Sequence, residues 1–128
     1  MMRSVLMLCL IPALVGCSND AIKADAELDG NWVETLSRTD TITFEKLDSS
    51  DSFNLNRGVE VLDGMSKPKY RSGTYLYTLG DGNISLKWLL SSNSAYEEYY
   101  FRLKGNRLRV GNFYDAPSGA ILEFEKLE

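Results

Sequence analysis

From Leu28 onward, short runs of the chain alternate between apolar and polar residues, and this period of two constrains the fold more than any other feature. Such alternation is typical of a strand with one buried face, whereas an amphipathic helix repeats every three to four residues. No long helical pattern follows it. The chain therefore predicts an all-β protein. The clearest run is 83–90, where one face collects Ile84, Leu86, Trp88 and Leu90.

Turn residues separate these runs. Gly80-Asp81-Gly82-Asn83, Ser91-Ser92-Asn93-Ser94, Lys104-Gly105-Asn106 and Asp63-Gly64 each fit a hairpin, because Gly and Asn tolerate the positive φ of tight turns. About eight strands joined in this way predict an antiparallel up-and-down meander that closes into a small barrel, with a two-sheet sandwich as the alternative. The expected strands cover residues 32–36, 41–45, 53–55, 59–62, 70–79, 83–90, 98–103, 107–113 and 122–125.

Length and charge limit the classes of function. A chain of 128 residues corresponds to one domain with its own core. The net charge of −4 and the lack of a basic run argue against a nucleic acid partner, which requires a clustered basic surface. The chain has no His, the side chain most used for acid-base chemistry and for zinc or copper. We therefore expect no metal and no cofactor.

The first residues have the organisation of a secretory signal. Arg3 precedes an apolar run, 5–15, that is too short to span a bilayer, which needs about 20 residues. The run ends at Leu14-Val15-Gly16-Cys17, which resembles the bacterial lipobox. The resemblance implies a lipoprotein: diacylglycerol joined to the Cys17 thiol, cleavage before this residue and acylation of the new amino terminus. A plain signal peptide that is cleaved elsewhere and leaves Cys17 free is the alternative.

This interpretation divides the chain into a signal peptide (1–16), an acylated tether (17–27) and a domain (28–128). Cys9 lies in the removed signal, so the mature chain has no disulfide. The mature chain is also acidic, so the lipid, rather than attraction to anionic headgroups, must hold it at a membrane. Ser18 instead of Asp after the cysteine favours the outer membrane of a Gram-negative bacterium; an inner membrane or a Gram-positive surface is the alternative.

The segment Leu28-Asp29-Gly30-Asn31-Trp32 resembles the first strand of the lipocalin and calycin group, especially small lipocalin-like domains of bacterial lipoproteins. The resemblance implies that Gly30 and Trp32 lie at the closed end of a barrel. It also implies an arginine from the last strands over the tryptophan, with Arg107 and Arg109 as candidates. The function it implies is binding of a small hydrophobic ligand inside the barrel.

A second segment, Tyr70-Arg71-Ser72-Gly73-Thr74-Tyr75, resembles a strand of the periplasmic lipoprotein inhibitors of lysozyme, which are also small barrels. This resemblance implies a different class of function. The chain would then be an interaction or inhibitor module that acts on an envelope protein through an exposed aromatic face.

Aromatic residues supply the candidate binding site under either hypothesis. Their simplest role is to fill the barrel core and to pack between strands. Alternatively, they line a pocket or a protein-binding face, since Tyr and Trp are favoured in both. The candidates are Tyr75, Tyr77, Trp88, Tyr99 and Phe101.

Catalysis is not the expected function. No Ser or Cys has a His to activate it. Paired carboxylates on a strand can raise one pKa for acid catalysis, but acids that alternate with apolar residues are typical of a solvated outer face. Gly80-Asp81-Gly82 is too short to cradle a phosphate. The carboxylate pairs are Glu97 with Glu98, Asp48 with Asp51, and Glu123 with Glu125.

Overall fold

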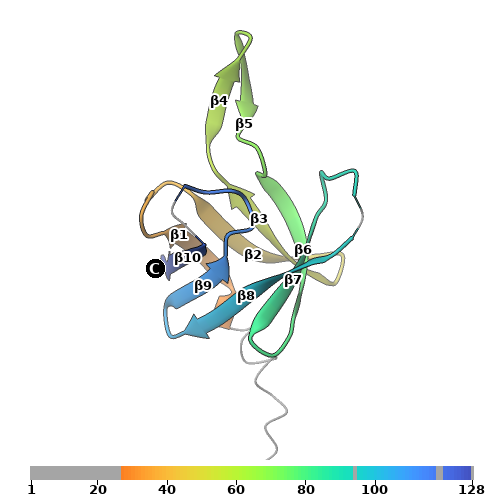
Figure 1. The fold of residues 1–128 in the computed structure, drawn as a ribbon, viewed down its shortest axis with the longest axis vertical. Coiled ribbons are helices and arrows are strands. Elements are labelled where there is room, and N and C mark those ends of the chain that lie inside the picture. The colour runs from red at the N-terminus through yellow and green to blue at the C-terminus, as the bar shows by residue number, and fades with distance from the viewer. Residues whose placement is uncertain (1–26, 94, 118–119, 128) are drawn as a thin grey trace, which may run out of the picture.

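The structure is a computed structural model that describes residues 27–93, 95–117 and 120–127. Eight of its strands form one closed antiparallel barrel, ordered β1-β10-β9-β8-β7-β6-β3-β2 (Figure 1). The predicted all-β barrel is thus confirmed, and the sandwich is not formed. No helix in these ranges is long and apolar enough to cross a membrane. The strands are β1 (Gly30–Glu34), β2 (Thr41–Leu47), β3 (Ser50–Asn56), β4 (Val59–Leu62), β5 (Met65–Pro68), β6 (Gly73–Leu79), β7 (Asn83–Trp88), β8 (Glu97–Lys104), β9 (Arg107–Gly111) and β10 (Ile121–Lys126).

Strands β4 and β5 do not belong to the barrel. Among the described residues they pair with each other alone and form a hairpin, here called the outer hairpin (59–68), that projects from one end of the barrel (Figure 1). Asp63 and Gly64 make its turn with φ of 53° and 76°, as the sequence predicted. Below it β3 pairs directly with β6, so the barrel closes without the hairpin. The predicted strand 70–79 was too long at its start, because Arg71 adopts a φ of 73° that breaks extended backbone.

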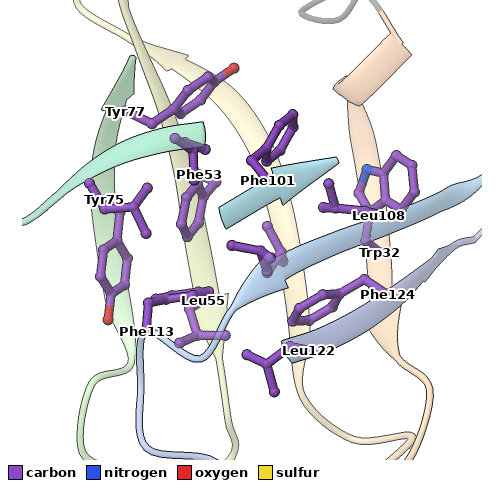
Figure 2. Packing of buried hydrophobic residues seen from close by; sticks show 14 of the residues in the cluster. Trp32, Phe53, Leu55, Tyr75, Tyr77, Phe101, Leu108, Phe113, Leu122 and Phe124 are labelled. Carbon is purple, nitrogen blue, oxygen red and sulfur yellow. The ribbon is translucent and has the colours of Figure 1, made fainter. Parts of the chain in front are cut away.

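Side chains fill the barrel interior. On the strands of the barrel the apolar residues of the alternating pattern point inward, and their rings pack across strands (Figure 2). Phe53, for example, stacks on Tyr75 with ring centroids 5.0 Å apart and also contacts Phe44 at 5.3 Å. Each fully buried side chain of this size stabilises the fold by about 1.5–3 kcal/mol. The members with the lowest exposure include Trp32, Leu28, Ile42, Leu55, Tyr114, Leu108, Leu122 and Phe124.

Trp32 lies fully buried at the end of the barrel where the described chain begins. Its Nε1 donates a hydrogen bond to the Leu28 carbonyl at 2.8 Å. Gly30, two residues earlier, has a φ of 119° that favours glycine. The cation over the Trp32 ring is Lys126 of β10, with its Nζ 5.6 Å from the ring centroid.

The expectation of an arginine at this place is wrong. Leu108 and Val110 point into the barrel, so Arg107 and Arg109 on the same strand point outward. There both arginines pair with Glu123, at 3.0 Å and 3.3 Å.

The connections differ in length between the two ends of the barrel. At the Trp32 end the turns between strands are short, at 48–49, 80–82 and 105–106. At the opposite end, here called the loop end, the connections are 35–40, 57–72, 89–96 and 112–120 (Figure 1). Long loops on a rigid scaffold are where binding residues concentrate.

Candidate functional site

The loop end is closed by part of the connection between β9 and β10. Phe113, Tyr114 and Ala116 are buried there, and this segment, 113–116, is here called the plug. The Phe113 ring lies 5.7 Å from Phe53 and 5.2 Å from Tyr75, both members of the barrel core. Figure 2 shows Phe113 beside Tyr75 and Leu55, with Trp32 on the far side of the cluster. The plug therefore occupies the mouth through which a ligand would enter.

The sequence had predicted this segment differently. Residues 107–113 were expected to form one strand, but β9 ends at Gly111. Asn112 then folds the chain back: its Nδ2 donates to the Ala116 carbonyl at 2.8 Å, and its Oδ1 accepts from the Ala116 amide at 2.9 Å. Asp115 between them has a φ of 57°. A side-chain amide that replaces two backbone partners in this way fixes a tight loop.

Polar contacts join the plug to two neighbouring loops. The Tyr114 hydroxyl donates to Asp40 Oδ2 at 3.0 Å. Arg57 lies over the Tyr114 ring at 4.8 Å, and its Nε is 3.9 Å from the same Asp40 oxygen. Burial, with the negative charge of Asp40 beside it, raises the pKa of Tyr114 well above its usual value. The hydroxyl therefore stays protonated and keeps its donor role.

Three of the five predicted site residues gather beside the plug. Tyr75 and Trp88 are directly opposite each other on β6 and β7, and their rings stack at 6.3 Å. The Tyr75 hydroxyl donates to the Arg71 carbonyl at 2.5 Å, and Trp88 Nε1 donates to the Ser72 carbonyl at 3.1 Å. Burial raises the pKa of Tyr75. These bonds fix the two rings against the start of β6.

Tyr99 is the third member. Its hydroxyl donates to Glu97 Oε2 at 2.6 Å. Burial, followed by this bond and the Glu97 charge, raises the pKa of Tyr99 to about 12. A hollow between these side chains has a volume of about 20 Å³, which suits a single water molecule. Besides Tyr75, Trp88, Tyr99 and Glu97, it is lined by Arg71, Leu86, Ser91, Asn93 and Ala95.

Tyr77 and Phe101 lie elsewhere. Both are buried in the barrel core, where the Tyr77 ring centroid lies 5.6 Å from that of Phe44 and 6.1 Å from that of Phe53. Their position fits the simpler of the two roles considered for the aromatic residues, that of filling the barrel core.

Arg71 is a component of this region that the sequence did not single out. Its guanidinium carbon lies 5.4 Å from the ring centroids of both Tyr70 and Trp88. Its Nε is buried and has no hydrogen-bond partner among the described residues. The only signal was its position next to Tyr70 in the inhibitor-like segment, because a positive φ at an arginine leaves no mark in a sequence.

The same end of the barrel carries an exposed apolar surface. Its residues come from three of the long connections and include both strands of the outer hairpin. Apolar patches on soluble domains commonly mark interaction sites. This surface, here called the apolar surface, consists of Leu36, Val59, Val61, Leu62, Met65, Tyr70, Leu89, Leu90 and Tyr96.

Most of the carboxylates that the sequence paired have basic or amide partners on the outside of the barrel. Arg107 contacts both Glu123 and Glu125, and Glu98 accepts a hydrogen bond from Asn83. Lys46 pairs with Asp51. In the part of the chain that the structure describes, no three His, Cys, Asp or Glu side chains come together as metal ligands. The lipidation candidate Cys17 lies outside the described residues.

The candidate site is therefore the loop end of a small β-barrel. It combines a buried aromatic cluster, a mouth filled by the plug and exposed apolar residues on the surrounding loops. This architecture is consistent with a lipocalin-like barrel and compatible with ligand binding. No family model, no curated protein and no solved structure matches the chain.

Proposed function

We propose that the protein is a non-catalytic interaction module of the bacterial cell envelope that binds another envelope protein through its loop end. One observation supports this most: the mouth is plugged from within while apolar side chains remain exposed around it. Val59, Val61 and Leu90 each expose more than 60% of their surface. A partner that covered them would remove apolar area from water, at about 25 cal/mol per Å².

The outer hairpin strengthens the proposal. A two-stranded hairpin without further strands is only marginally stable in water, and both of its outer edges offer free backbone groups. Natural sheets usually cover or charge such edges. On β4, however, the outer hairpin displays Val59 and Val61 on one face. A strand of the partner that paired with this edge would form hydrogen bonds with its backbone N–H and C=O groups and would also cover these valines.

Attachment at Cys17 is the second part of the proposal. The described chain starts at the Trp32 end of the barrel, and the outer hairpin projects from the opposite end (Figure 1). A tether from Cys17 to Glu27, even fully extended, reaches about 35 Å. An anchor there would hold the Trp32 end toward the membrane and present the loop end to the aqueous space, where a protein partner would be met.

A small hydrophobic ligand, as in lipocalins, is the second candidate. The aromatic cluster of Tyr75, Trp88 and Tyr99 favours it, because such side chains bind apolar groups. The hollow among them holds about 20 Å³, so a ligand larger than water would need to displace the plug or the 89–96 loop.

Photocrosslinking in intact cells tests the proposal. A photoreactive residue replaces Val61 in the outer hairpin or, as the matched control, Leu47, an exposed apolar residue at the other end of the barrel. We expect one discrete crosslinked protein from position 61 and none from position 47. A Leu90→Asp change should remove that product. The same pattern from both positions, or a product that survives Leu90→Asp, would contradict binding at the loop end.

Native mass spectrometry of the full chain in detergent tests the second candidate. A stoichiometric small molecule, together with no crosslink at position 61, would favour the lipocalin-like function.

A further inference from the structure

A second hollow lies at the loop end, between the 35–40 loop and the plug. Its volume is about 290 Å³, far larger than the hollow at Trp88. Pockets for drug-sized ligands begin at about 300 Å³, so this space suits a smaller group. The hollow, here called the acidic hollow, is lined by Glu34, Leu36, Ser37, Asp40, Ala116 and Pro117.

Glu34 has one carboxylate oxygen without a partner. It is the last residue of β1 and only 2% exposed. Its Oε2 accepts hydrogen bonds from the amides of Leu36 at 3.0 Å and Ser37 at 2.5 Å. Its Oε1 is buried and has no hydrogen-bond partner in the described parts of the chain. Buried carboxylate oxygens are normally hydrogen-bonded, so Oε1 lacks the donor that such an oxygen usually has.

The charges around the acidic hollow do not balance. Asp40, also buried, faces Arg57 at 3.9 Å and accepts from Tyr114. Arg57 donates from its NH1 to the Tyr70 carbonyl at 2.7 Å, and among the described residues it is the one guanidinium within 4 Å of either carboxylate, that of Asp40. Two carboxylates with a single cation leave a negative charge in a partly buried site, which is costly unless a cation compensates it.

Apart from Ser37, the remaining lining is apolar. Leu36, Ala116 and Pro117 contribute no charge, and Leu36 is 72% exposed at the rim. A group that fits both parts of the lining has an aliphatic stem and a cationic head, as lysine and arginine side chains have.

We propose that the acidic hollow receives a lysine or arginine side chain of the partner protein, an assignment that rests on the proposed function. The stem lies between Leu36 and Pro117, and the cation lies beside the Glu34 carboxylate, which lines the acidic hollow. Leu36, which lines the acidic hollow, is one of the exposed apolar residues of the loop end, so the hollow lies at the same end of the barrel as the apolar surface.

Short peptides test the assignment on the full chain in detergent. The probe is the blocked tripeptide Ac-Gly-Lys-Gly-NH₂, with its arginine counterpart, and the matched control contains norleucine, which keeps the stem but lacks the ammonium. Binding is followed by NMR at the amides of Leu36 and Ala116. We expect saturable binding of the lysine or arginine peptide, at least about tenfold tighter than that of the norleucine peptide, because the peptide's cation forms a charged hydrogen bond.

Two variants check which carboxylate is responsible. Glu34→Gln keeps an oxygen for the Leu36 and Ser37 amides, so the loop should remain folded, but it removes the charge. We expect it to weaken the basic peptide about tenfold, whereas Glu45→Gln, on an exposed carboxylate of β2, leaves binding unchanged. Asp40→Asn, which still accepts from Tyr114, should weaken binding as well.

Equal binding of the lysine and norleucine peptides, unchanged affinity in Glu34→Gln, or no saturable binding of any peptide would overturn the assignment. The crosslink at position 61 separates this failure from failure of the proposed function. If the crosslink persists while the peptides fail, the partner binds the apolar surface alone. If the peptides bind while the crosslink is absent, the acidic hollow binds a small cationic molecule, and the proposal of a protein partner is wrong.

Discussion

Replacing Phe113 by alanine tests whether the plug fills the barrel mouth. The ring is 3% exposed and lies between 5.0 and 6.1 Å from the rings of Phe53, Tyr75, Tyr99 and Tyr114. Truncation of a buried phenylalanine to alanine costs about 3–5 kcal/mol, because the transfer energy is lost and a cavity remains. In a domain of about 100 residues each kcal/mol lowers Tm by about 4 °C or more, so Tm should fall by at least about 12 °C.

Urea unfolding followed by tryptophan fluorescence gives the free energy of unfolding, and thermal circular dichroism gives Tm. Tyr100→Ala, at an exposed ring on β8, is the control and should cost less than about 1 kcal/mol. The Phe113→Ala variant should also bind an apolar dye that the unaltered protein excludes. A loss as small as that of the control would refute the view that Phe113 is a core residue and that the barrel is closed.

Three further predictions concern other parts of the chain. Trp32→Phe should lower the free energy of unfolding by about 1–3 kcal/mol, measured by urea denaturation, because the buried Leu28 carbonyl loses its donor. The raised pKa of Tyr99, about 12 instead of 10, favours the protonated folded state. Stability should therefore be complete below pH 10 and fall as the pH rises toward 12; in Tyr99→Phe the fall should be shallower, and an identical pH profile would disprove the link. Cys17→Ala should leave the precursor uncleaved and unlabelled by radioactive palmitate, and a variant recovered acylated at the membrane would contradict the anchor.

The barrel was predictable because alternation records which side chains face the core. Ile84 and Leu86 are buried as their pattern indicated, while Leu90 on the same pattern is exposed. Leu90 lies beyond the end of β7, and a period of two does not show where pairing stops. The same limit explains why Phe113 was assigned to a strand.

The outer hairpin was half predicted. Val59–Leu62 has the β-branched residues of a strand and was expected, whereas β5 has the sequence Met-Ser-Lys-Pro, which lacks any alternation. Residues 65–68 form a strand because they pair with β4. Whether a strand joins the barrel depends on long-range register, and here Phe53 pairs with Tyr75 and leaves no room between β3 and β6.

The candidate site was predictable in its residue types more than in its arrangement. Tyr75, Trp88 and Tyr99 do meet, since all three occupy inward positions at the loop end of adjacent strands. The acidic hollow was not foreseen, because Glu34 ends an otherwise ordinary strand and nothing local marks its carboxylate as buried. Lys126, and not an arginine, lies over the Trp32 ring. The alternation along β9 places Leu108 and Val110 inside the barrel, so Arg107 and Arg109 point outward.

The position of the outer hairpin bears on how such a protein can change over time. Because β3 pairs with β6 beneath it, residues 59–68 form an insertion that the barrel does not need for closure. Substitutions there escape the packing constraints that restrict every inward position of the barrel. The length and sequence of the outer hairpin can therefore change while the barrel keeps its fold. Under the proposed function, such changes would alter which partner is bound.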